Sequence, residues 1–144
     1  MYDQSVGRNC SFVIGAVIKP DGTLPEADVK RLAEFGAEIK RRFGKPVAET
    51  KGDGEVLELH LSEPVQINAV IIMEDIGRGE RVREYGIDGR TPDGKWVQLG
   101  AGQSIGHKRI QSFARQELAA VRVRFTKSIA PPVIRRLAVF DTGA

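Results

Sequence analysis

Few side chains in this 144-residue sequence have the types and spacing that could carry out a reaction. Only two histidines are present, and no serine or cysteine lies in a recognisable nucleophilic motif. Glu74 and Asp75 could supply the two carboxylates that most glycosidases need. Neighbouring strand residues point to opposite faces, so these two cannot flank one bond unless the chain bulges. We therefore predict no catalytic residue, and favour structural pairing of the carboxylates with Arg81 or Arg83.

Sugar binding is the second chemistry that the sequence could support. Sugar rings stack on aromatic faces, while charged and amide groups make paired hydrogen bonds to their hydroxyls. The densest polar group is His107-Lys108-Arg109, directly after a glycine. The alternative for this group is a solvated loop in which Arg109 pairs with an acid. The candidate glycan contacts are Glu74, Arg81, His107, Lys108 and Arg109.

Other reactive or aromatic residues have simpler interpretations. We expect Trp96 to pack against the core and Cys10 to be a small core residue. Arg122 and Arg124 are expected to form a solvated strand face. No Cys or His pair has zinc-ligand spacing, and no loop has enough oxygen ligands to assign calcium. We therefore predict neither a metal nor another cofactor.

Composition and charge argue against several classes of protein. The chain holds 22 Lys and Arg against 19 Asp and Glu, and their interleaving argues against nucleic-acid binding. The longest apolar stretch, residues 12–18, has 7 residues, whereas a membrane helix needs about 20, so no membrane span is expected. Residues 1–20 show no secretory signal, and the compartment stays open.

One helix, predicted over residues 24–43, is the first element that must position these side chains. Its apolar residues recur at steps of three and four and so share one face. Thr23 and Glu26 are expected to form a capping box at its start. Gly44 in a left-handed conformation, followed by Pro46, would end it. The apolar face consists of Val29, Leu32, Phe35, Ile39 and Phe43.

The segment 10–18, before this helix, has the composition of a buried strand in a parallel sheet. Such a strand needs neighbours, which the rest of the sequence does not offer. An unpaired strand edge favours association. We therefore expect residues 12–18 either to form a homodimer or to pack against the remaining strands.

The remaining sequence alternates apolar and polar residues in short runs. Leu57, Leu59 and Leu61 would share one strand face, with Glu58 and His60 on the other. The predicted strands cover 55–61, 66–73, 82–90, 95–99, 103–106, 111–116, 119–126 and 133–140. The predicted fold is mainly β, an antiparallel β-sandwich or jelly roll over residues 47–144, preceded by one strand and one α-helix in residues 1–46.

Two groups of motifs suggest relatives. The first comprises Ser5-Val6-Gly7-Arg8-Asn9, Pro20-Asp21-Gly22, Leu24-Pro25-Glu26-Ala27-Asp28-Val29-Lys30-Arg31-Leu32 and Phe35-Gly36. It resembles the closing strand and helix of the catalytic barrel of α-L-fucosidases, family 29 of the glycoside hydrolases. The second comprises Leu57-Glu58-Leu59, Glu74-Asp75-Ile76, Gly79-Glu80-Arg81-Val82, Gly94-Lys95-Trp96 and residues 104–110. It resembles the galactose-binding-like sandwich, of the discoidin or coagulation factor five/eight type C kind, that follows that barrel.

The resemblance implies a C-terminal fragment of such an enzyme, with a sandwich that supports the barrel and could contact a fucosylated or galactose-containing glycan. The family's nucleophilic Asp and acid/base Glu lie on upstream loops, and no segment here matches them, so we expect the chain to be inactive alone. The parent protein would be secreted or periplasmic. A stand-alone carbohydrate-binding module and a structural or protein-interaction sandwich are the alternatives.

Overall fold

The computed structural model describes residues 1–143, which form one helix and six strands. Short 3-10 turns lie at Tyr2–Gln4 and Ile76–Arg78. The helix is α1 (Glu26–Phe43), and the strands are β1 (Ala48–Asp53), β2 (Val56–Glu74), β3 (Val82–Arg90), β4 (Trp96–Gly102), β5 (Arg109–Ser128) and β6 (Val133–Phe140).

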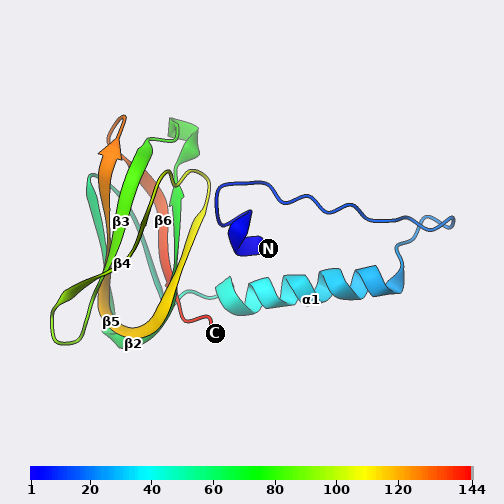
Figure 1. Ribbon diagram of the computed structural model, residues 1–144, viewed down its shortest axis with the longest axis horizontal. Coiled ribbons are helices and arrows are strands. Elements are labelled where there is room, and N and C mark those ends of the chain that lie inside the picture. The colour runs from blue at the N-terminus through cyan, green and yellow to red at the C-terminus, as the bar shows by residue number, and fades with distance from the viewer. Residues whose placement is uncertain (144) are drawn as a thin grey trace.

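The strands form one antiparallel sheet in the order β1-β6-β2-β5-β3-β4, which folds over to make the two layers of a sandwich (Figure 1). The fold-over uses β2 and β5, which have 19 and 20 residues. Residues 69–74 of β2 pair with β6, while residues 120–128 of β5 pair with β3. Shifts of register within β2 mark the bends. The predicted antiparallel sandwich is therefore confirmed.

The core lies between the two layers. Leu137 of β6 is fully buried in one cluster with Ile87 of β3 and Val123 of β5. The predicted alternation in β5 is confirmed, since Val121, Val123 and Phe125 are buried and the arginines between them are partly exposed.

Several strand predictions differ from the structure. The pairs 55–61 with 66–73 and 111–116 with 119–126 are each one bent strand. Residues 103–106 form a loop rather than a strand, and β1 was not predicted. Strands β3 and β6 have the predicted bounds.

Helix α1 ends at Phe43 as predicted and begins within two residues of the predicted start, but the predicted capping box and the left-handed conformation of Gly44 are wrong. Its N-cap is Pro25 and no side chain caps it. The Thr23 hydroxyl donates instead to Asp21 (2.7 Å), whose carboxylate also accepts the Thr23 N–H. Gly44 has φ −71°, a right-handed conformation, and its N–H continues the helical pattern to the Lys40 carbonyl.

The prediction of a buried strand over residues 10–18 is wrong. In the part of the chain that the structure describes, this segment pairs with no strand, and it runs alongside α1 away from the sandwich (Figure 1). Val13 and Val17 are 87% and 74% exposed. Cys10 is exposed as well, so its expected place in the core is also wrong. A strand requires a neighbour for its backbone hydrogen bonds, and the described residues supply none.

Helix α1 joins the sandwich through its last turn. Phe43 packs edge-on against Phe140 of β6, with ring centroids 5.5 Å apart, and Tyr2 adds a third ring at 6.2 Å from Phe43. These rings cover the outer face of the layer that contains β6. No helix within residues 1–143 combines the length and the apolar character that crossing a membrane requires.

Candidate functional site

Glu74, the first predicted glycan contact, lies buried at the base of two loops. Its side chain is 1% exposed. One carboxylate oxygen accepts the backbone N–H groups of Arg81 (2.8 Å) and Val82 (3.0 Å), and the other accepts that of Gly106 (2.8 Å). The predicted pairing with an arginine side chain is therefore wrong, because backbone donors occupy this carboxylate. Glu74 ties residues 75–82 to the loop before β5.

Arg81 and the acidic neighbour of Glu74 point elsewhere. The Arg81 guanidinium donates to the carbonyls of Pro131 (2.8 Å) and Arg78 (3.3 Å). Asp75 forms an ion pair with Arg78 (3.6 Å). The two adjacent carboxylates thus lie in different environments, one buried and one partly exposed.

The N-terminal segment docks onto the loop before β5 through Asn9, a residue that the sequence analysis did not select. Its side-chain oxygen accepts the His107 N–H (2.7 Å), and its amide donates to Glu80 (3.1 Å). Its backbone N–H donates to the Lys108 carbonyl (3.0 Å). Gly106 has φ +62°, and a Cβ there would overlap the Asn9 amide, so glycine is required.

The three neighbouring residues His107, Lys108 and Arg109 contact different parts of the chain. His107 is exposed, and its ring Nδ1 contacts the Arg135 guanidinium (3.1 Å). Lys108 donates to the Tyr2 hydroxyl (3.2 Å) and lies over the Tyr2 ring. Arg109 begins β5 and pairs through its backbone with Arg8. No carboxylate in the described part of the chain pairs with Arg109, so the alternative of an acid-paired Arg109 is wrong.

A groove of about 580 Å³ beside His107 adds polar residues that the sequence analysis missed. It lies between β1, the turn Ile76–Arg78 and the start of β6, and Arg135 connects it to His107. Sequence alone gave no signal for it, because its residues come from three distant segments. Its charged lining residues are Lys51, Asp53, Asp75, Arg78 and Arg135.

The outer face of the β3–β4–β5 layer carries a second polar cluster. Asp88, 4% exposed, accepts hydrogen bonds from Arg124 (2.6 Å) and Arg122 (2.9 Å). The Arg124 hydrogen bond chiefly lowers the pKa of Asp88, and Arg122 adds to this effect while burial opposes it. The expected packing of Trp96 against the core is wrong, because Trp96 belongs to neither core cluster and its ring lies under the Arg122 guanidinium (4.1 Å). The expected solvated basic face is therefore a cluster in which the carboxylate of Asp88 offsets part of the charge of the two arginines.

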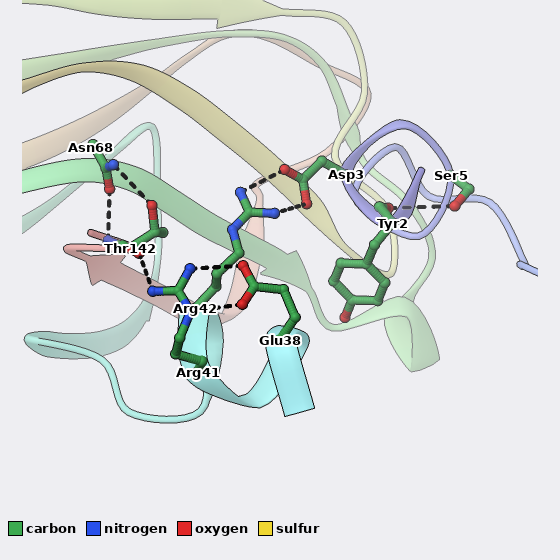
Figure 2. A network of polar contacts seen from close by, with 8 residues as sticks. All are labelled: Tyr2, Asp3, Ser5, Glu38, Arg41, Arg42, Asn68 and Thr142. Atoms are coloured by element: carbon green, nitrogen blue, oxygen red, sulfur yellow. Dashed lines mark hydrogen bonds and ion pairs between the residues drawn. The ribbon is translucent and has the colours of Figure 1, made fainter. Parts of the chain in front are cut away.

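A network at the junction fixes α1 and the N-terminal segment to the sandwich (Figure 2). Arg42 of α1 makes two bonds to Asp3, at 2.8 and 3.3 Å. Arg41 donates to the Thr142 carbonyl (2.8 Å), and Thr142 in turn exchanges two hydrogen bonds with Asn68 of β2. Among residues 1–143, no group of three or more His, Cys, Asp or Glu side chains is placed to hold a metal ion.

Comparison with known proteins finds several that are similar to this chain over nearly its whole length. α-L-fucosidase 1 of Arabidopsis thaliana is 24% identical over an alignment 176 residues long, which covers 97% of this chain and 35% of that protein. A solved structure from Bacteroides thetaiotaomicron VPI-5482, designated an α-L-fucosidase, is 40% identical with a TM-score of 0.94, covering 97% of this chain and 32% of its own. A glycoside hydrolase 29 family member from an unknown rumen bacterium is 29% identical with a TM-score of 0.85, over 96% of this chain and 27% of its own.

The chain matches part of the α-L-fucosidases of glycoside hydrolase family 29. It spans about a third of the length of these family 29 relatives and corresponds to their C-terminal part. The match covers most of residues 1–46, with the extended segment and α1, as well as the sandwich, because 97% of the chain aligns. No family model matches the chain.

The sandwich also resembles proteins outside family 29. A chitosan-binding module, derived from a chitosanase/glucanase of Paenibacillus sp. IK-5, aligns with 72% of this chain at 15% identity and a TM-score of 0.51. The alignment covers 84% of that module. This likeness concerns the fold alone.

Proposed function

We propose that this chain is the non-catalytic C-terminal part of an α-L-fucosidase-like glycoside hydrolase. In this proposal the extended segment 10–18 and α1 complete a barrel whose other strands lie upstream. The observation that carries it is the apolar surface of these two elements. Ile18 is 67% exposed and Val29 is 50% exposed, and the backbone of residues 10–18 pairs with no strand in the described chain. A parallel barrel strand buries such residues on both faces.

The lack of chemistry in the described residues supports the non-catalytic assignment. A retaining glycosidase places two carboxylates about 5 Å apart on either side of the bond that it cleaves. The buried carboxylate at the loop base, Glu74, accepts three backbone hydrogen bonds. The other buried carboxylate, Asp88, is engaged by two arginines. Neither can act as a nucleophile while it holds these partners.

Complementation tests this proposal. The chain is mixed with the part of the B. thetaiotaomicron protein that it does not cover, and turnover of an aryl α-L-fucoside is measured, with the intact B. thetaiotaomicron protein as the positive control. We expect no turnover by the chain alone, co-purification of the two pieces, and turnover by the mixture. Turnover by the chain alone would overturn the non-catalytic assignment. Failure of the pieces to co-purify would overturn the supporting role.

A charged residue on the apolar surface of residues 10–18 should distinguish specific association with the upstream part from nonspecific association of the chain. Val17→Asp places a carboxylate on the segment that would be buried in the barrel, so we expect loss of co-purification. Gln98→Asp, on the exposed side of β4, makes the same charge change and should leave co-purification unchanged.

Without upstream residues, the segment 10–18 is expected to pair with a second copy of the chain. Sedimentation velocity should then show a dimer that Val17→Asp dissociates.

A stand-alone carbohydrate-binding module is the second candidate function. Its support is the groove of about 580 Å³ beside His107 together with the fold of the chitosan-binding module. We propose that His107 and Arg81 would contact the sugar while Glu74 holds the loops in place. A structural or protein-interaction sandwich is the outcome if no sugar binds.

An NMR titration with L-fucose, and galactose for comparison, tests the binding role. Saturable shifts confined to residues 74–81 and 106–110 and to the groove residues 51–53 and 133–135 would support it, and the absence of shifts at millimolar sugar would overturn it. His107→Ala should weaken binding. His60→Ala removes another exposed histidine, on β2, and serves as the matched control.

A further inference from the structure

A small polar cavity lies where the N-terminal segment meets the start of β5. Its volume is about 320 Å³, and its walls are held by two backbone contacts. The Ile110 N–H donates to the Gly7 carbonyl (2.8 Å), and Arg8 forms an antiparallel bridge with Arg109. A Cβ on Gly7 would lie 2.9 Å from the Ile110 Cβ, so the close approach requires glycine. The lining residues are Asp3, Gln4, Arg8, Arg109, Gln111 and Ser112, with Ile110 between the strands.

The charge in this cavity is unbalanced. Arg8 and Arg109 both line it, and neither guanidinium forms an ion pair with a carboxylate of residues 1–143. The one acid in the wall, Asp3, is already held by two bonds from Arg42. Elsewhere in the structure, Arg41 and Arg136 hold carboxylates at 2.7 and 2.8 Å. The cavity therefore presents two guanidinium groups that lack an anion.

Two buried polar atoms beside the cavity also lack partners. These are the Nε of Arg109 and the hydroxyl of Tyr85, a residue that is 2% exposed. Burial raises the pKa of the Tyr85 hydroxyl, while the charge of Arg109, a side-chain interaction with Arg109 and the charge of Arg8 act in the opposite direction. Buried donors in native proteins almost always have an acceptor, so these two atoms mark an incompletely satisfied corner beside Arg109.

We propose that this cavity binds the carboxylate of an acidic ligand the size of one sugar, of the uronic acid type. Guanidinium groups bind carboxylates through paired, charge-assisted hydrogen bonds, and Arg8 and Arg109 would share the anion. Gln4, Gln111 and Ser112 supply hydrogen-bonding groups for ring hydroxyls. The volume lies at the lower end of the range for small-molecule sites, which suits a single ring. The inference concerns a surface other than the groove beside His107.

Binding can be measured by NMR titration of the labelled chain at constant ionic strength. We expect sodium D-glucuronate to give saturable shifts at residues 3–8 and 109–112, and neutral methyl D-glucoside to give none there. Acetate and sulfate distinguish a sugar acid from a simple anion, and we expect each to compete weakly. Binding of acetate as tight as that of glucuronate would overturn the sugar-sized assignment. The absence of saturable shifts with all three anions, or shifts confined to the groove beside His107, would overturn the site.

Arg8→Gln is the decisive variant because the Arg8 side chain is exposed and its loss should not impair folding. Removing one charged donor should weaken glucuronate binding about tenfold or more. Arg8→Lys keeps the charge without the planar fork and should restore only part of the affinity. Arg31→Gln makes the same charge change on α1, where the side chain is 85% exposed, and should leave binding unchanged. Unchanged affinity in Arg8→Gln would overturn the proposal, whereas loss of fucoside complementation would not bear on it.

Discussion

The sandwich and the preceding strand-like segment with its helix use similar apolar residues with opposite results. In the sandwich, Leu137 and Val123 are fully buried between two layers. In residues 10–43, Val13 is 87% exposed and Leu32 is 38% exposed. An apolar pattern therefore specifies a face that must be covered. The described chain covers this face in the sandwich and at the last turn of α1, but leaves much of the rest of residues 10–43 exposed. The sandwich also buries polar groups, and its buried carboxylates are hydrogen-bonded.

The largest effect is expected at Glu74, which connects two loops of the sandwich. Glu74→Ala leaves three backbone N–H groups without their acceptor, and we expect the free energy of unfolding to fall by about 4 kcal/mol. Glu34→Ala on α1 removes an exposed carboxylate and should change it by less than about 0.5 kcal/mol. Urea denaturation of both variants measures the difference. Equal effects would mean that burial does not distinguish the two regions.

Two leucines test the apolar side of the comparison. Leu137→Ala opens a cavity in the core, and we expect a loss of about 3 kcal/mol in the free energy of unfolding. Leu32→Ala, on the partly exposed face of α1, should cost no more than about 0.5 kcal/mol in the same urea experiment. A large cost at Leu32 would show that this face is already covered, for example by a second copy.

Local alternation made much of the sandwich predictable. Strands β3 and β6 follow from runs of alternating or β-branched residues between turns, and the α1 face follows from its period. Strand β1 was missed because Ala48–Asp53 lacks an apolar alternation, and only its pairing with β6 makes it a strand. Ser62 to Pro64 looked like a loop, whereas the chain bends there within β2.

The candidate site was predictable only as a set of neighbouring loops. Glu74 and Asp75 are equally polar in sequence, and the burial of Glu74 depends on backbone donors 7, 8 and 32 residues away. The docking of Asn9 onto His107 spans 98 residues, so no local pattern reports it. The segment 10–18 was misassigned for the converse reason: its composition fits a strand, but pairing requires a second chain segment.

Acid titration should separate the two regions through Asp88 and Asp21, whose pKa values are both lowered. The Asp88 carboxylate is held mainly by Arg124 in the sandwich, and the Asp21 carboxylate mainly by the Thr23 hydroxyl in an exposed turn. A carboxyl with a lowered pKa stabilises the fold above its unfolded pKa of about 3.9, and this contribution disappears as the pH falls through the folded value. Asp88→Asn should therefore cost about 2 kcal/mol at neutral pH and progressively less below about pH 4.

Thermal or urea unfolding of Asp88→Asn against the parent chain at several pH values measures this dependence. Asp21→Asn should show no matching dependence, since water and salt screen the exposed turn. A pH-independent cost in Asp88→Asn would indicate that Asp88 acts through its shape rather than its charge.

The smallest changes in the free energy of unfolding are expected at two tyrosines, and the two changes should have opposite signs. Tyr2 belongs to the N-terminal segment, and its hydroxyl accepts a hydrogen bond from Lys108 (3.2 Å), so Tyr2→Phe should cost up to about 1 kcal/mol. Tyr85 lies in the sandwich with a hydroxyl that has no partner, so Tyr85→Phe should raise the free energy of unfolding by up to about 1 kcal/mol. Differential scanning calorimetry without added anions measures both. A loss of stability in Tyr85→Phe would mean that Arg109 already satisfies this hydroxyl, and the cavity would then owe its affinity to the two arginines alone.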